Sequence, residues 1–171
     1  MHGLETIQNA IGGRKVTSNA KRTTPVFNPA TGEQSAILPL SDVSEINDAV
    51  AAAKKASIEW GATPPLKRVK PMFKFKELLE RHANDIARAI SKEHGKTHAD
   101  ALGELARGID VVDFACGIPH LLKGEYSRNV GPEIDSWSDR QALGVVAGIT
   151  PFNFPAMVPM WMYPVAVACG N

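Results

Sequence analysis

The sequence has few cysteines and almost no net charge. Two cysteines among 171 residues, Cys116 and Cys169, are too few for a disulfide framework and too far apart for a CxxC pair. We therefore expect a reducing compartment and a cytoplasmic location. Nineteen Lys and Arg against eighteen Asp and Glu leave a net charge of +1, so no overall field would attract nucleic acid. The 44% hydrophobic and 22% charged residues are typical of a globular protein.

Most catalytic and metal-binding motifs are absent as well. The chain contains no GxSxG, HExxH, P-loop or GxGxxG pattern. His94 and His98 have the i,i+4 spacing of a metal-binding pair, but Gly95 between them predicts a helix end, so we expect no metal site. Neither Cys116 nor Cys169 is accompanied by a candidate base, and neither is predicted to be a nucleophile.

Residues 141–171 carry no charged side chain, and this is also typical of a membrane span. However, four prolines interrupt this stretch, and each removes a backbone donor and disfavours the surrounding helix. A lipid-exposed span would leave the freed carbonyls unsatisfied. The stretch therefore predicts a buried strand, turn and helix, and no association with a membrane.

Local patterns predict short strands in the first forty residues and helices after them. Gly12-Gly13 indicates a hairpin turn. Asp42 and Glu45 have capping-box spacing and predict a helix that ends at Gly61. Pro64-Pro65 predicts the next helix, with Pro71 either in a later first turn or at a kink. Two more helices are predicted, one capped by Asn84 and ending at Gly95, the other over residues 98–122.

The last part of the chain divides into an arm and a βα unit. Polar strands over Glu125–Ser127 and Ile134–Gln141, joined by a turn at Asn129–Pro132, predict an arm that is exposed or pairs with another subunit. Leu143–Ile149 is a short apolar run, typical of a strand buried on both faces of a parallel sheet. A turn and a buried helix over Ala156–Ala168 complete the first half of a βαβ crossover. We therefore expect an incomplete α/β fold divided into 1–124, 125–141 and 142–171.

Asn153 and Arg107 are the two candidate functional residues. Asn153 lies in an apolar stretch just after the predicted strand, where open α/β sheets bind ligands. Its amide could stabilise an oxyanion, a role worth roughly 3–4 kcal/mol, although spacing alone favours a cap for the following helix. Arg107 follows Glu104 at i+3, and the residues alone favour a surface ion pair over a fork aimed at a substrate carboxylate.

Several segments resemble the aldehyde dehydrogenase superfamily. The segment over residues 143–155, LGVVAGITPFNFP, resembles the superfamily's PWNFP region, and NPATGE over residues 28–33 resembles a turn that its members share. Phe152, where most members have Trp, the run AMVPMWMYP and the pattern Glu104-x-x-Arg-Gly-Ile109 are similar to the CoA-acylating (methyl)malonate-semialdehyde dehydrogenases. The resemblance spans essentially the whole chain.

This resemblance implies a role for each candidate residue. Asn153 would donate to the oxygen of a thiohemiacetal intermediate, and Arg107 would bind the substrate carboxylate. The segment 125–141 would be the oligomerisation arm of a homotetramer. The NAD site would be lined partly through backbone atoms by Ile149, Thr150, Pro151 and Phe152. The fold would be an aldehyde-dehydrogenase-like α/β fold with the first βα unit of a Rossmann-like NAD domain.

The resemblance also implies a reaction. A cysteine attacks a carboxylated semialdehyde, hydride passes to NAD, the intermediate loses carbon dioxide, and the acyl group is transferred to CoA as co-substrate. The products are propionyl-CoA or acetyl-CoA. The family's nucleophilic cysteine and general-base glutamate correspond to positions beyond residue 171, so this chain alone is expected to be inactive. The alternative is a non-enzymatic truncated product that docks on full-length subunits.

Overall fold

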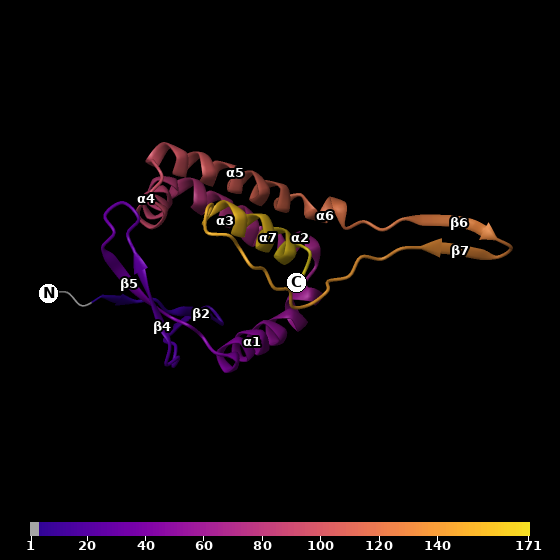
Figure 1. Ribbon diagram of the computed structural model, residues 1–171. Coiled ribbons are helices and arrows are strands. Elements are labelled where there is room, and N and C mark those ends of the chain that lie inside the picture. Colours follow the sequence, from indigo (N-terminus) through magenta and orange to yellow (C-terminus); the bar gives the residue numbers. More distant parts are fainter. Residues whose placement is uncertain (1–3) are drawn as a thin grey trace.

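The computed structural model describes residues 4–171 as a group of N-terminal strands, a bundle of helices and a projecting hairpin (Figure 1). The strands, in chain order, are β1 (Glu5–Thr6), β2 (Asn9–Ile11), β3 (Arg14–Val16), β4 (Thr23–Phe27), β5 (Gln34–Pro39), β6 (Tyr126–Gly131) and β7 (Ile134–Trp137). The helices are α1 (Val43–Ala62), α2 (Pro65–Arg68), α3 (Lys70–Arg81), α4 (Ala83–His94), α5 (His98–Cys116), α6 (Ile118–Leu121) and α7 (Met157–Ala168).

The N-terminal strands form two small sheets. One has the order β1-β5-β4, with β1 parallel and β4 antiparallel to β5. The other is the β2–β3 hairpin, whose turn residues Gly12 and Gly13 have φ of +58° and +75°. Such angles are readily available only to glycine. The predicted hairpin at Gly12-Gly13 is confirmed.

Most predicted helix boundaries follow from local chemistry. The Asp42 side chain accepts from the Ser44 and Glu45 amides, and Glu45 accepts in return from the Asp42 amide, so the capping box is confirmed. Helix α1 ends at Ala62, one residue past the expected Gly61. The helix predicted from Pro64-Pro65 is divided at Val69 into α2 and α3, and Pro71 lies in the first turn of α3. Gly95 ends α4 in the left-handed region, as predicted.

Two predicted boundaries are wrong. Helix α4 begins at Ala83 after His82, so Asn84 does not cap it and lies within its first turn. The helix expected over 98–122 is two helices, because α5 ends at Cys116 and α6 begins at Ile118. Gly117 between them has low helix propensity, and Pro119 lies in the first turn of α6, where its missing amide hydrogen is tolerated.

The core lies around α5, which packs against α3, α4 and α7. Leu105 and Val112 of α5 contact Leu79 of α3 and Met160 of α7 in one buried cluster. Further clusters join Ala101 to α4 and the C-terminal end of α5 to Val69, α3, α6 and α7. Only one face of α7 is buried, since Trp161, Met162 and Tyr163 are exposed. The helix predicted over Ala156–Ala168 is therefore present but is not buried all round.

Two polar side chains fasten the C-terminal end of α7 to the region around α1 and α2. Arg68 is 5% exposed, and it donates to the carbonyls of Ala168, Gly61 and Thr63 at 3.1, 3.1 and 2.9 Å. The Trp60 indole donates to the Val167 carbonyl at 2.8 Å. The charged guanidinium thus satisfies helix-end carbonyls that would otherwise lack donors.

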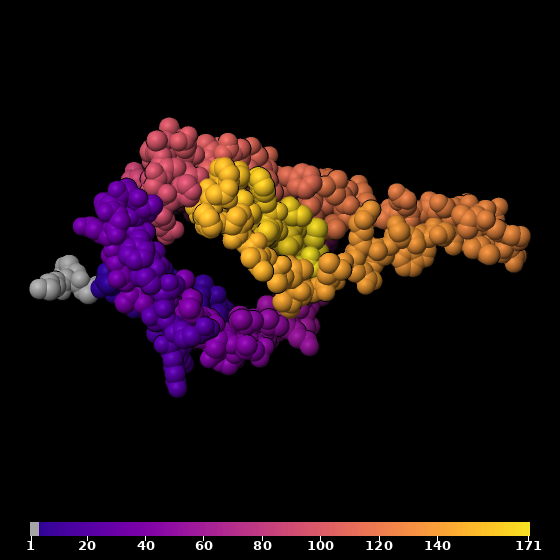
Figure 2. All heavy atoms as spheres, viewed as in Figure 1, coloured from indigo at the N-terminus to yellow at the C-terminus, as the bar shows by residue number. Residues whose placement is uncertain are grey.

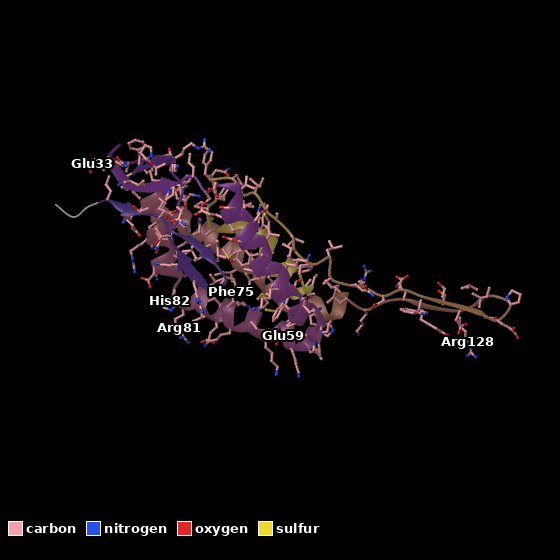
Figure 3. All side chains as sticks on the ribbon, turned by 90° about the horizontal axis from the view of Figure 1, so that it is seen from below. Glu33, Glu59, Phe75, Arg81, His82 and Arg128 are labelled. Carbon is pink, nitrogen blue, oxygen red and sulfur yellow. The ribbon has the colours of Figure 1, made fainter. Side chains whose placement is uncertain are left out.

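The β6–β7 hairpin projects away from the helices (Figures 1 and 3), and Arg128 lies on it. Its strands pair antiparallel, with Tyr126 opposite Trp137 and Gly131 opposite Ile134. The turn therefore lies at Pro132 and Glu133, later than the predicted Asn129–Pro132. Tyr126, Val130, Ile134 and Trp137 are all exposed. The two-stranded arm is confirmed as a structure, and its role in assembly stays a prediction.

The strand predicted over Leu143–Ile149 is not formed. The segment has no secondary structure, and Leu143 and Ile149 are 88% and 94% exposed. A parallel strand needs a neighbour for its backbone hydrogen bonds, and within residues 4–171 no strand lies beside this segment. Its first amides, those of Leu143 and Gly144, donate instead to the Asn171 side chain at 2.6 and 3.1 Å. The division into 1–124, 125–141 and 142–171 stays a prediction.

Within the described residues, no helix combines the length and the apolar character that crossing a bilayer requires.

Candidate active site

The turn before α7 carries Asn153, and the residue that caps α7 lies elsewhere in the chain. No side chain within this turn caps α7, so the expectation that Asn153 caps it is wrong. Glu104 of α5 does so instead, because its Oε1 accepts from the amides of Ala156 at 2.8 Å and Met157 at 3.1 Å. A carboxylate at this position satisfies donors that a helix start leaves free and interacts favourably with the helix dipole. Asn153 itself is an exposed residue.

Glu104 is completely buried, and its charge is balanced by Lys96. The Lys96 ammonium lies 2.6 Å from Glu104 Oε2, and the Lys96 side chain is 11% exposed. Burial raises the pKa of the Glu104 carboxyl, but hydrogen bonds from Lys96, Ala156 and Met157 outweigh it and lower the pKa below 4.5. The carboxylate is therefore ionised at neutral pH, and the pair satisfies the condition under which buried charges are tolerated.

Lys96 connects this ion pair to the turn that carries Asn153. Its ammonium donates to the backbone carbonyl of Asn153 at 3.1 Å and lies 4.4 Å from the centre of the Phe154 ring. The residue stands between Gly95, which ends α4, and Thr97, whose side chain caps α5. The junction of α4 and α5 is thus held against the start of α7.

Arg107 lies beside the same turn and does not pair with Glu104, so the predicted surface ion pair is wrong. Its Nε donates to the Met157 sulfur at 3.3 Å, and its guanidinium carbon lies 5.7 Å from the Phe154 ring centre. The residue is exposed. Among the described residues none accepts a hydrogen bond from its two terminal nitrogens. Phe154 therefore lies close to two cations, and one of them has donors available for a ligand.

The segment proposed to line a cofactor site is exposed. Ile149 is 94% and Phe152 89% exposed, and Thr150 and Pro151 are exposed as well. Phe152 and Pro155 line a hollow of about 850 Å³ whose other walls are the N-terminal strands and the end of α4. Figure 2 shows an opening between the indigo strands and the orange and yellow segment that leads into α7.

Neither cysteine has the surroundings of a nucleophile. Cys116 is buried in the core, and burial raises the pKa of its thiol, with a smaller contribution from the charge of Asp113. Cys169 is half-buried at the end of α7. Over residues 4–171, no group of three His, Cys, Asp or Glu side chains is arranged to hold a metal ion.

Sequence reasoning missed Lys96 and the capping role of Glu104. The available signal was the position of Glu104 on the apolar face of α5. Ala101 and Gly108, one turn away on either side, and the adjacent Leu105 are buried, so a charged residue among them requires partners. The identity of those partners depends on the packing of α7, which lies about fifty residues further along the chain.

Comparisons with known proteins agree on one family. The profile of the aldehyde dehydrogenase family matches residues 16–171. The chain is 56% identical over 168 residues to the malonate-semialdehyde dehydrogenase of Pseudomonas aeruginosa. These aligned residues make up 98% of this chain and 34% of that protein. The crystal structure of a methylmalonate-semialdehyde dehydrogenase from Oceanimonas doudoroffii superposes with a TM-score of 0.95 at 58% identity, covering 98% of this chain and 34% of that one.

A second solved structure contains a cofactor. It is an NAD complex of a candidate methylmalonate-semialdehyde dehydrogenase from Sinorhizobium meliloti 1021, with a TM-score of 0.96 and 44% identity over all of this chain and 35% of that one. The chain thus spans about a third of the length of the relatives it matches.

Proposed function

Because the chain belongs to the aldehyde dehydrogenase family and has its α/β fold, we propose that it forms the N-terminal part of a cytoplasmic, NAD-dependent, CoA-acylating (methyl)malonate-semialdehyde dehydrogenase. The observation that carries the proposal is that Asn153 is exposed and that Arg107, whose terminal nitrogens have no partner among the described residues, lies against the ring of the next residue, Phe154. An amide donor and a guanidinium at the same turn suit a substrate with an aldehyde at one end and a carboxylate at the other. The names of the relatives describe such substrates.

In the proposed reaction Asn153 donates from its amide to the oxygen of the tetrahedral thiohemiacetal. Its freedom to do so is supported by Glu104, which has taken over the capping of α7. A preorganised donor aimed at a developing oxyanion contributes a factor of about 10²–10³ to kcat. The backbone of Asn153 is anchored through its carbonyl, so the donor is attached to a fixed point.

Arg107 is the proposed partner of the substrate carboxylate. Its Nε is occupied by the Met157 sulfur, which leaves the two terminal nitrogens as a fork for two carboxylate oxygens. Contact with the Phe154 ring restricts where this fork can lie. An aldehyde without a carboxylate would gain nothing from this residue, so Arg107 would select for semialdehydes.

NAD is the proposed hydride acceptor, and its contacts within this chain are assigned to Ile149, Thr150, Pro151 and Phe152. Their exposure leaves their backbone atoms accessible to a ligand. The α7 N-terminus does not fit a pyrophosphate, because the Glu104 carboxylate already occupies its amide donors and would repel a second anion. The NAD-containing structural relative supports the cofactor. CoA is proposed as the acyl acceptor only on the resemblance of Phe152, of residues 156–164 and of the pattern over residues 104–109.

The nucleophile of the proposed reaction is neither Cys116 nor Cys169, since one is buried with a raised pKa and the other closes a helix end. A preparation of residues 1–171 alone is therefore expected to form no NADH from malonate semialdehyde, NAD and CoA. The exposed apolar side chains of the β6–β7 hairpin support its proposed role as the arm that joins subunits of a homo-oligomer.

The test is to assay the complete gene product that carries this sequence with malonate and methylmalonate semialdehyde. NADH and the acyl-CoA product are expected to form together. Asn153→Ala should lower kcat about 10²–10³-fold. Asn84→Ala, which removes an exposed amide bonded to His98, is the matched control and should leave kcat unchanged. A complete gene product that reduces no NAD with any aldehyde would contradict the proposed function.

A further inference from the structure

We propose that Lys96 and Glu104 act together as a clamp that positions Asn153 for oxyanion binding. This inference rests on the proposed function, since it assigns a purpose to the geometry around the proposed oxyanion donor. Neither residue is proposed to touch the substrate. Both act through the backbone of the turn between Asn153 and Met157, so we describe them as positioning residues.

The clamp holds the turn at both ends. At its start, the Lys96 ammonium donates to the Asn153 carbonyl at 3.1 Å. At its end, Glu104 Oε1 accepts from the amides of Ala156 and Met157 at 2.8 and 3.1 Å. The two side chains are joined to each other at 2.6 Å. The turn therefore cannot shift at either end without breaking a charge-assisted hydrogen bond.

Phe154 ties the middle of the turn to the same ammonium. The centre of its ring lies 4.4 Å from Lys96 Nζ, so the ammonium has three partners: a carboxylate, a carbonyl and an aromatic ring. An ammonium has three N–H groups, so its donors are fully used. This saturation suits a residue whose task is to fix a backbone and argues against Lys96 as a binding group for the substrate.

The Asn153 side chain depends on this anchoring because it makes no hydrogen bond of its own to any residue from 4 to 171. The direction of its amide is set by the backbone on which it stands, and that backbone is held by Lys96. Displacing a catalytic group by about 1 Å can cost on the order of 10²-fold in rate. Loosening the turn should therefore reduce the chemical step more than it reduces the binding of substrate or NAD.

The variants must separate positioning from folding. Lys96→Met keeps the apolar stem and removes the ammonium, but it leaves the buried Glu104 carboxylate without its cation, which destabilises a protein. The double variant Lys96→Met with Glu104→Gln removes both charges, while the glutamine oxygen can still accept from the Ala156 and Met157 amides. Lys74→Met is the matched control, because it breaks an exposed pair with Glu77 of similar length, 2.7 Å.

The experiment measures kcat per titrated active site, and KM for malonate semialdehyde and for NAD, in the complete gene product. We expect both Lys96 variants to lower kcat about tenfold. Each KM should stay within about twofold, because no direct contact with a ligand is removed. Lys74→Met should match the wild type. An unchanged kcat per active site in the double variant, or a loss confined to KM, would overturn the inference.

Hydrogen exchange separates failure of the clamp from failure of the proposed function. If the wild-type gene product oxidises no aldehyde, the proposed function is wrong, and the clamp is judged on the exchange of the Ala156 and Met157 amides alone. Lys96→Met should speed their exchange several-fold, and Lys74→Met should not. Equal exchange rates in wild type and Lys96→Met would show that no clamp exists.

Discussion

Gly108, in the middle of α5, faces the first turn of α7, and its replacement by alanine tests how closely the two helices pack. A Cβ added at Gly108 would lie 2.3 Å from Met160 Cε, 3.1 Å from Met160 Sδ and 3.4 Å from Met157 Cα. Carbon atoms in favourable contact are about 3.5–4.0 Å apart, so the first of these contacts is a severe overlap. The same helix pair carries Glu104 and the turn of Asn153, so the test concerns the site as well as the core.

The expected magnitude follows from two opposing terms. Alanine gains about 1 kcal/mol over glycine in a helix interior, whereas overpacking a core costs about 1–3 kcal/mol. Met160 is flexible but only 2% exposed, and it packs in a cluster with Leu79, Leu105 and Val112, so moving its methyl group away would disturb these neighbours. We therefore expect a cost near the upper limit and a net destabilisation of about 2 kcal/mol.

Gly103 provides the matched control on the same helix. A Cβ there meets nothing within 4 Å, so Gly103→Ala should gain the helix term alone, about 1 kcal/mol. Urea unfolding of the chain, followed by circular dichroism, should separate the two variants by about 3 kcal/mol. The cost of Gly108→Ala should shrink when Met160 is also replaced by Ala, since the overlap is then relieved. Equal stability of the two glycine variants would refute the close packing of α5 and α7.

Three further predictions concern the site and the arm. In the complete gene product, Arg107→Leu should raise KM for malonate semialdehyde on the order of 10–100-fold and KM for propanal far less, because only the semialdehyde loses a charge-assisted hydrogen bond. Steady-state kinetics measure both values, and equal effects on the two substrates would reduce Arg107 to a structural residue. The folded-state pKa of Glu104 lies below 4.5, so the stability it contributes is present above pH 4.5 and is lost as the pH falls through that lowered value. Acid unfolding of wild type should accordingly be steeper than that of Glu104→Gln, and parallel curves would contradict the assignment. Val130→Lys on the exposed hairpin should weaken assembly of the complete gene product in sedimentation experiments without altering its circular dichroism, whereas an unchanged mass would argue against the arm.

The features that the sequence predicted correctly are those decided by neighbouring residues. The capping box of Asp42 and Glu45 needs only four consecutive residues, and it forms as expected. The turn at Gly12-Gly13 and the end of α4 at Gly95 depend on positive φ angles that glycine adopts at no steric cost. The arm over β6 and β7 is predicted from two polar strands around a turn and needs no contact with the helices.

The predictions that failed depend on contacts between distant parts of the chain. Leu143–Ile149 has the composition of a buried strand, but a strand forms only where another strand offers hydrogen bonds, and within the described residues none lies beside it. Asn84 has the chemistry of a cap, yet α4 begins two residues earlier than a cap at Asn84 would require, because His82 already turns the chain from α3 into α4. Composition indicates what a segment can do, and the packing partner decides whether it does so.

Two anomalies in the sequence, a carboxylate on the apolar face of a helix and an amide in an uncharged segment, explain each other in the structure. An asparagine before a helix ordinarily turns its side-chain oxygen to the free amides of the first turn, and the direction of the Asn153 NH2 group would then be fixed by the helix start. Glu104 supplies that cap from 52 residues away, and it can remain charged in the core because Lys96 pairs with it. The buried ion pair therefore leaves the amide of Asn153 exposed while fixing the backbone beneath it. A local pattern search assigns the cap to Asn153 because it considers only residues near the helix start. Only the packing of α5 against α7 identifies Glu104 as the cap and leaves Asn153 available for chemistry.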